Sequence, residues 1–355
     1  MLALSKYWSN VVQQLDPYVP GEQPKDKTYI KLNTNENPYP PSPNVLSAIR
    51  QVADENLRLY PTPTCDDLRT YIAQYHGLTK EQIFVGNGSD EVLAFSFLAF
   101  FNPHSAILFP DITYSFYPVY CALFHIDYTV VPIDEEFSIP VEKFFAKNGG
   151  IIFPNPNAPT GKVVSLQAIE EILRHNADQV VIVDEAYIDF GGESADVLLD
   201  KYDNLLIIQT FSKSRSLAGL RIGFAMGHPD LIEALDRVKN SMNSYTLDRV
   251  ALAGALESFK DEKYFQDTCQ KVIAIREKTI LQLETIGFRI IPSKANFIFI
   301  NHPLMCAEEL YQKLRERGIL VRYFKKPRID NFLRVSIGTE QEMECFIKEI
   351  TEILS

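Results

Sequence analysis

The hydrophobic pattern of the chain changes along its length, and the change predicts its architecture. Between about residues 45 and 245, short runs that are apolar throughout alternate with segments of helical periodicity. Such runs are typical of strands buried on both faces, as in a mostly parallel sheet covered by helices. The sequence therefore predicts an α/β region with strands at 83–85, 105–109, 128–131, 151–153, 180–184, 205–209 and 222–226.

The last third of the chain has a different pattern. Its apolar periodicity predicts a long helix at 247–286, further helices at 307–317 and 340–354, and strands near 288–291, 295–300, 319–323 and 332–336. We expect a smaller α+β domain there. Residues 16–43 contain seven prolines and read as an extended arm. The expected division is an arm at 1–44, a large domain at 45–245 and a small domain at 246–355.

Polar residues follow several of the predicted strands, at the edge where open α/β sheets bind ligands. Lys213 follows the apolar strand at 204–209, with Ser212 beside it and Arg221 eight residues on. A hydroxyl and a guanidinium suit a phosphate dianion. A lysine in this setting suits an amine that forms a Schiff base beside a phosphate, which is the chemistry of pyridoxal phosphate (PLP).

A possible phosphate cradle follows the strand at 83–85. The segment at 86–91 reads GNGSDE, and Ser89 is expected to cap a helix that begins at Asp90 and offers free backbone N–H groups. The third glycine of a dinucleotide fingerprint is replaced by Glu91, which disfavours a nicotinamide oxidoreductase. Taken alone, the segment also fits an ordinary capped turn.

Other strand ends offer partners for a pyridine ring. Asp184 ends the strand at 180–184 and suits a protonated pyridine nitrogen, and Tyr187 is placed to reach the ring hydroxyl. Tyr114 suits stacking on a flat ring, and the loop at 155–161 suits the aiming of an Asn side chain. Each residue alone also fits a cap, a turn or the core. Together they predict one PLP site.

Composition narrows the function classes. The chain has 355 residues and a formal net charge of −11, which disfavours a nucleic-acid partner. Its longest apolar segment, 92–101, is far shorter than the roughly 18 residues of a membrane span. The N-terminus lacks a secretory pattern. The five cysteines, without CxxC spacing, suggest reduced thiols in the cytoplasm, and the six scattered histidines suggest no metal site.

The set Asp184-x-x-Tyr187, Ser212-Lys213 and Arg221 resembles the class I and II aminotransferases of fold type I, and the resemblance covers nearly the whole chain. The segments LNTNENP at 32–38, LYP at 59–61 and FLRVSIG at 332–338 resemble the branch that acts on histidinol phosphate. The implied fold has a seven-stranded-type, mostly parallel sheet, a small α+β domain, and an arm that packs on the small domain and a partner subunit.

The resemblance also implies residue roles. Lys213 would form the Schiff base and move the proton, Asp184 would pair with the pyridinium, and Tyr187 would bond the ring oxygen. The remaining implied cofactor residues are Ser89, Asp90, Ser212 and Arg221 at the phosphate, Tyr114 on the ring, and Tyr60 reaching from the partner of a homodimer. The implied substrate residues are Tyr18, Asn35, Arg322 and Arg334.

One position departs from the family pattern. The family loop reads Asn-Asn-Pro-Thr-Gly, and its Asn before Pro contacts the ring oxygen, whereas this chain has Ala158 there. We expect Asn157 or Tyr187 to take over that contact, or one hydrogen bond to be lost, at a cost of about 1 kcal/mol.

The implied activity is transamination of L-histidinol phosphate with 2-oxoglutarate, which gives imidazole-acetol phosphate and L-glutamate in histidine biosynthesis. An aromatic amino-acid aminotransferase and a PLP-dependent decarboxylase of a phosphorylated amino acid share the same cofactor residues. A non-catalytic PLP-binding module is the alternative of a different class, and the complete acid–base set disfavours it.

Overall fold

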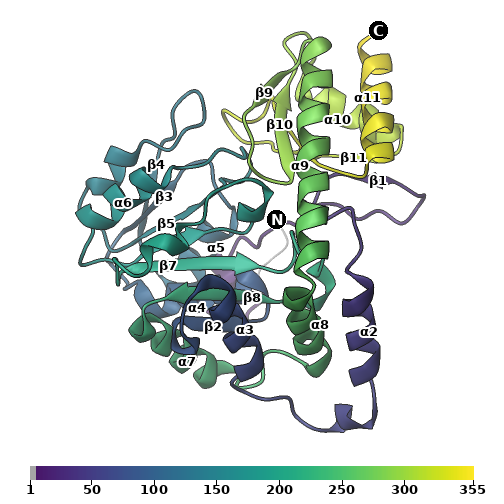
Figure 1. The fold of residues 1–355 in the computed structure, drawn as a ribbon. Helices are drawn as coiled ribbons and strands as arrows, with labels where there is room; N and C mark the ends of the chain where they lie inside the picture. The colour runs from purple at the N-terminus through teal and green to yellow at the C-terminus, as the bar shows by residue number, and fades with distance from the viewer. Residues whose placement is uncertain (1–4) are drawn as a thin grey trace.

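A seven-stranded sheet forms the centre of the computed structural model, which describes residues 5–355 (Figure 1). Its spatial order is β2-β8-β7-β6-β5-β3-β4, and only β8 runs antiparallel to its neighbours. The mostly parallel sheet expected from the apolar runs is confirmed. The strands are β2 (Ile83–Gly86), β3 (Ile107–Pro110), β4 (Tyr128–Val131), β5 (Ile151–Pro154), β6 (Val181–Asp184), β7 (Leu205–Thr210) and β8 (Gly223–Gly227).

Helices cover both faces of this sheet, which explains why its strands are apolar throughout. In β7, Leu205 and Ile207 point into one hydrophobic cluster, and Leu206 and Ile208 point into another on the opposite face. The first cluster includes residues of α2 (Pro43–Val52), α3 (Asp66–His76), α6 (Leu166–His175) and α8 (Arg249–Lys260). The second includes residues of α4 (Gly88–Phe100), α5 (Phe116–Phe124) and α7 (Pro229–Met242).

A second, four-stranded antiparallel sheet lies beside the first, in the order β12-β13-β10-β9 (Figure 1). It comprises β9 (Arg289–Ile291), β10 (Phe297–Asn301), β12 (Arg322–Tyr323) and β13 (Leu333–Ser336). The helices α9 (Glu262–Thr285), α10 (Ala307–Glu316) and α11 (Glu340–Leu354) share its hydrophobic cluster. The expected α+β character of this part is confirmed, whereas the domain limits at 44/45 and 245/246 stay predictions.

The arm is joined to the small sheet unit. Its strand β1 (Ile30–Lys31) pairs in parallel with β11 (Ile319–Leu320). The prediction of a single strand at 319–323 is therefore wrong. The chain pairs with β1 up to Leu320 and, after Val321, pairs with β13 as β12. The remaining elements are α1 (Asn10–Gln14) and the short 3₁₀ turns η1 (Glu55–Arg58), η2 (Lys80–Gln82), η3 (Val141–Phe145), η4 (Ile188–Phe190), η5 (Ala195–Leu198) and η6 (Ala218–Leu220).

Two helix boundaries differ from expectation. The helix expected at 247–286 is two helices, because Asp261 has non-helical dihedrals (φ −90°, ψ 54°) between α8 and α9. The helix α4 begins at Gly88, so Ser89 lies in its first turn and Asn87 occupies the cap position. Glu91 reaches back to accept a hydrogen bond from the Asn87 N–H (2.6 Å), and this replaces the cap expected from Ser89.

No helix within residues 5–355 is long and apolar enough to cross a membrane.

Close backbone packing between β8 and the start of α4 generates a test. A Cβ atom added to Gly223 would collide with the backbone of Gly88 and Ser89, which cannot move aside as a flexible side chain would. We expect Gly223→Ala to lower the free energy of unfolding by about 1–3 kcal/mol, measured by urea denaturation.

Gly219→Ala is the matched control, because open space surrounds that position. We expect this variant to keep its stability or gain about 0.4–1 kcal/mol. Equal stability of the two variants would contradict the close packing.

Candidate active site

A cavity of about 200 Å³ lies at the carboxyl ends of β5, β6 and β7, where Pro154, Asp184 and Thr210 line it. The start of α4, other loops of the large unit, the arm and the small sheet supply the rest of its wall. Twelve of the residues expected at the site line this one cavity: Tyr18, Asn35, Ser89, Asp90, Tyr114, Asp184, Tyr187, Ser212, Lys213, Arg221, Arg322 and Arg334. Residues from distant parts of the chain thus meet where an open α/β sheet binds its ligand.

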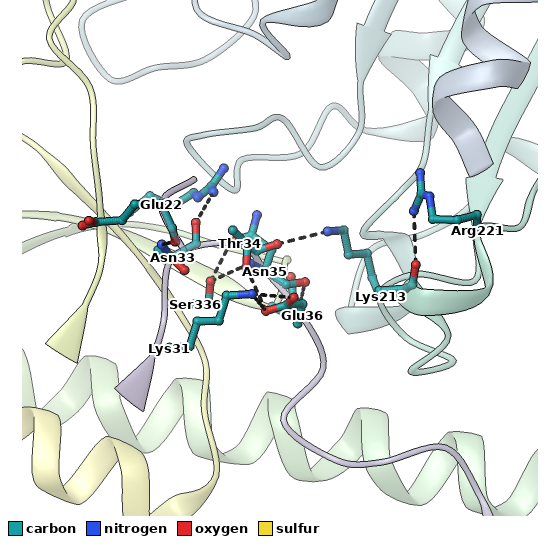
Figure 2. A network of polar contacts seen from close by, with 12 residues as sticks. Glu22, Lys31, Asn33, Thr34, Asn35, Glu36, Lys213, Arg221 and Ser336 are labelled. Carbon is teal, nitrogen blue, oxygen red and sulfur yellow. Dashed lines mark hydrogen bonds and ion pairs between the residues drawn. The ribbon is translucent and has the colours of Figure 1, made fainter. Parts of the chain in front are cut away.

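Lys213 extends from the turn after β7 toward the arm. Its ammonium donates to the carbonyl oxygen of Thr34 (3.3 Å; Figure 2) and lies 5.7 Å from the centre of the Tyr187 ring. Burial, together with the nearby charge of Arg334, lowers the pKa of Lys213 from 10.5 to about 8. A substantial fraction of the amine is therefore neutral near physiological pH, as a nucleophile or base requires.

Asp184 is a buried carboxylate at the end of β6. It accepts hydrogen bonds from the Tyr117 hydroxyl (3.0 Å) and the Ala186 N–H (3.2 Å). Burial raises its pKa from 3.8 to about 6. A carboxylate so placed in a cavity wall suits a cationic partner, which would return its pKa toward the ordinary range.

The start of α4 and the loop after β7 form an anion cradle. The Arg221 guanidinium donates to Ser212 Oγ (3.3 Å) and to Asp90 Oδ2 (3.0 Å), and the Tyr114 hydroxyl donates to Asp90 Oδ1 (2.8 Å). A Cβ atom on Gly88 would lie 2.6 Å from Arg221 Nη2, so only glycine permits this approach. The Asp90 carboxylate accepts hydrogen bonds from Arg221 and Tyr114. The group of Asp90 that could bind an anion is therefore its backbone N–H.

Two guanidinium groups stand side by side at the small-sheet wall of the cavity. Arg322 and Arg334 are directly paired across β12 and β13. Arg334 donates to Asn33 O (2.9 Å), and Arg322 donates to Val19 O (3.1 Å) and Pro20 O (3.3 Å). Within residues 5–355 neither group has a carboxylate within 4.0 Å, and the buried Arg334 Nε has no hydrogen-bond acceptor. Two adjacent cations without a counter-ion favour an anionic ligand.

Asn35 connects the arm to both sheets. Its side-chain N–H₂ donates to the Tyr187 hydroxyl (3.1 Å), and its side-chain oxygen accepts from Ser336 Oγ (2.8 Å; Figure 2). Its backbone is left-handed (φ 57°), a conformation that Asn tolerates better than most residues. Asn35 therefore fixes the Tyr187 ring. Tyr18, farther along the arm, stacks on Phe116 with ring centres 4.3 Å apart.

Two expected cofactor residues lie outside the cavity wall. The buried Asn157 uses its side-chain N–H₂ on Ile112 O (3.0 Å) and Thr160 Oγ1 (3.2 Å), whereas Ala158 lines the cavity. This arrangement does not favour the expected ring contact from Asn157, so a contact from Tyr187 and the loss of one hydrogen bond stay as the two predictions. Tyr60 is 77% exposed and stacks on Tyr245, with ring centres 4.6 Å apart. This position suits a residue that serves another subunit, a role that stays a prediction.

Sequence reasoning missed two contributors. Tyr117 holds Asp184, and Thr34 offers its carbonyl oxygen to Lys213. Tyr117 lies in the first turn of α5, and its N–H donates to the carbonyl oxygen of Tyr114 just before that helix (3.3 Å), so its nearness to Tyr114 in the sequence was an available signal. A backbone carbonyl leaves no signal in the sequence.

Comparison with known proteins settles the family. The family model for aminotransferase class I and II matches residues 27–350. The chain belongs to this family. It is 60% identical to the histidinol-phosphate aminotransferase of Clostridium acetobutylicum, over 99% of this chain and 100% of the relative. It is 59% identical to the enzyme of that name from Clostridium botulinum (strain Langeland), over 99% of both chains.

The fold also matches a solved aminotransferase. The crystal structure of histidinol-phosphate aminotransferase from Sinorhizobium meliloti in complex with pyridoxal-5′-phosphate superposes with a TM-score of 0.89, at 23% identity and over all of both chains. Identity at that level supports the fold alone. The seven-stranded sheet and the small unit are therefore those of a fold-type I aminotransferase.

The lowered pKa of Lys213 generates a test. In the chain freed of cofactor, the neutral amine is the nucleophile, so its acylation rate should rise with pH through about 8 and then level off, as followed by mass spectrometry of the Lys213 peptide. Arg334→Met removes a nearby positive charge and should move the midpoint upward. A wild-type midpoint near the ordinary lysine value of 10.5 would contradict the assignment.

Proposed function

We propose that the chain transfers the amino group of L-histidinol phosphate to 2-oxoglutarate with PLP as cofactor, giving imidazole-acetol phosphate and L-glutamate in histidine biosynthesis. One observation supports this most strongly: a cavity with an amine of lowered pKa also presents two guanidinium groups that have no carboxylate partner among residues 5–355. The names of relatives up to 60% identical over the full chain agree with it.

The residues of the cavity fit PLP. Ser89, Ser212 and Arg221 would hold its phosphate, because the α4 N-terminus and a guanidinium meet there. Asp184 would pair with the ring nitrogen, and Tyr114 would lie against the ring. When bound, PLP supplies an aldehyde for a covalent link to Lys213 and a ring that withdraws electrons from the substrate Cα.

Lys213 is the proton carrier in this scheme. Its neutral amine would remove the proton from the substrate Cα and deliver it to the cofactor carbon that keeps the amino group, and in the second half-reaction it would move a proton back to the Cα of the new glutamate. Asp184 would keep a proton on the ring nitrogen, and the Asn35 amide holds the Tyr187 hydroxyl in position for the ring oxygen. The Arg334 charge that lowers the Lys213 pKa thereby favours the base form.

The arginine pair determines which substrates fit. Histidinol phosphate carries a phosphate ester in place of an α-carboxylate, and two guanidinium groups suit that dianion. The same pair also suits the carboxylates of glutamate and 2-oxoglutarate, so one cavity serves both half-reactions. Tyr18 closes the arm side of the cavity.

We also propose a cytoplasmic homodimer. All five cysteines are unpaired, which suits a reducing compartment. The exposed Tyr60 ring suits a contact with the partner's cofactor phosphate.

The direct test follows glutamate formation from histidinol phosphate and 2-oxoglutarate. We expect Lys213→Ala to lower kcat by roughly a hundred- to ten-thousand-fold, because the proton carrier is lost. Exposed Lys147→Ala is the control and should leave kcat unchanged. Phenylalanine and tyrosine serve as rival donors. Faster turnover of either one, or an active Lys213→Ala chain, would contradict the proposal.

A mixing experiment tests Tyr60. A mixed dimer of Lys213→Ala and Tyr60→Ala chains has one site with both residues intact, so co-expression should restore about a quarter of wild-type activity per subunit. Lys213→Ala co-expressed with a chain that carries both substitutions has no intact site and should stay inactive. A fully active Tyr60→Ala enzyme, or no recovery on mixing, would exclude the role.

A further inference from the structure

Arg215 is a buried cation enclosed at the break between α8 and α9. Its guanidinium carbon lies 3.8 Å from the ring centre of Phe259 and 4.0 Å from that of Phe265, and Nη1 donates to Ser258 O (2.7 Å). Only 6% of the side chain is exposed. Phe259 belongs to α8 and Phe265 to α9, so the planar group stacks on both sides of the break at Asp261.

The setting of Arg215 is a costly one for a charge. Its nearest carboxylate atom, Glu262 Oε2, is 4.0 Å away and has no hydrogen bond of its own. Burial lowers the pKa of Arg215, yet a guanidinium stays protonated in proteins. An apolar side chain of similar volume is often at least as stable as a buried ion with imperfect partners. Two ring faces, the Ser258 carbonyl and the charge of Asp189 offset part of this burial cost, and stability alone does not require an arginine here.

The backbone of Arg215 belongs to the turn that carries Lys213. The Ser216 N–H donates to Lys213 O (3.3 Å), and the Leu217 N–H donates to Phe211 O (3.0 Å). From the arm, the Asn37 side-chain N–H₂ donates to Lys213 O (3.0 Å) and Ser214 O (3.1 Å).

Contacts on other sides complete the support of this turn. Ser214 Oγ donates to Asp189, which follows the cavity residue Tyr187. Arg215 supplies the contact with the α8–α9 break. The turn is thus held by the arm, by the segment after β6 and by the break.

The break lies where two hydrophobic clusters meet. Phe259 belongs to the cluster that contains one face of the large sheet, and Phe265 belongs to the cluster of the small sheet. A displacement of α9 relative to α8 would move one aromatic face against the guanidinium. Arg215 is therefore a side chain through which the packing of α9 reaches the Lys213 turn, separate from the arm contact made by Asn37.

We propose that Arg215 is a positioning residue: it sets the place of the Lys213 amine according to how α8 and α9 are packed around its guanidinium. This inference rests on the proposed function, in which Lys213 transfers a proton and the position of its amine therefore affects the rate. It does not give Arg215 any contact with substrate or cofactor.

The test compares two substitutions at this position. Arg215→Met keeps an unbranched side chain of similar volume without the charged guanidinium, and it should lower kcat roughly 10- to 100-fold, because a small misplacement of a reacting group has effects of that size. The KM for histidinol phosphate should stay within about threefold, since no substrate contact is lost. Arg215→Lys keeps the charge without the planar stack and should give an intermediate kcat.

Amide hydrogen exchange on the chain without added cofactor gives a readout independent of activity. The Ser216 and Leu217 amides, which close the turn, should exchange at least about tenfold faster in Arg215→Met, with β6 and β7 unchanged. The midpoint of thermal unfolding should match or exceed that of the wild type.

Arg69→Met is the control: its side chain is 12% exposed and contacts Asp236 and Lys80 O on the large-sheet side. It should leave kcat unchanged.

Several results would overturn the inference. A kcat of Arg215→Met within about twofold of wild type would exclude a positioning role. Faster exchange throughout β6 and β7, or an equal fall of kcat in Arg69→Met, would show a general loss of stability instead. If the wild-type chain fails to transaminate histidinol phosphate, the proposed function fails, and the exchange of the turn still reports whether Arg215 holds it.

Discussion

The parallel register of β5, β6 and β7 is the constraint on which the site depends. In this register Pro154 pairs with Asp184, and Asp184 pairs with Ile208, so the three strands end at one edge. The segments that leave that edge carry the buried carboxylate of Asp184, the amine of Lys213 and part of the wall of the cavity. None of these groups is near another in the sequence. Hydrogen bonding between strands, driven by burial of both sheet faces, brings them together.

The same constraint explains what the sequence could predict. Strands buried on both faces leave uninterrupted apolar runs, so the strand positions were recognisable, and the polar residues at their ends marked the cavity. The boundaries that failed depend on contacts made elsewhere in the fold. Asp261 is an ordinary polar residue within a helical pattern, so the sequence does not mark the break there. In the fold, Arg215 lies between Phe259 and Phe265, which flank the break. The start of α4 depends on Glu91 reaching back to Asn87, which competes with the cap expected from Ser89.

Within the site, side chains that follow a strand were predictable, and supporting groups were not. Tyr117 resembles a core aromatic until its hydroxyl is seen on Asp184. The contact between Lys213 and the arm uses a backbone carbonyl, which any residue at position 34 would supply. The departure from the family pattern at Ala158 is visible in the sequence, but the direction of the neighbouring Asn157 side chain is not. The carbonyl of Ile112 also requires a donor, and Asn157 provides it.

The pairing of β1 with β11 has a mechanical consequence. Through this pairing and the Asn35–Ser336 contacts, the arm is hydrogen-bonded into the small unit at two places. Arg322 adds a third attachment by holding the carbonyl oxygens of Val19 and Pro20. Any rigid displacement of the small sheet must therefore carry the arm with it. The stretch of arm that lines the cavity and the two guanidinium groups of Arg322 and Arg334 thus belong to one hydrogen-bonded unit, so the arm side and the small-sheet side of the cavity keep a fixed spacing.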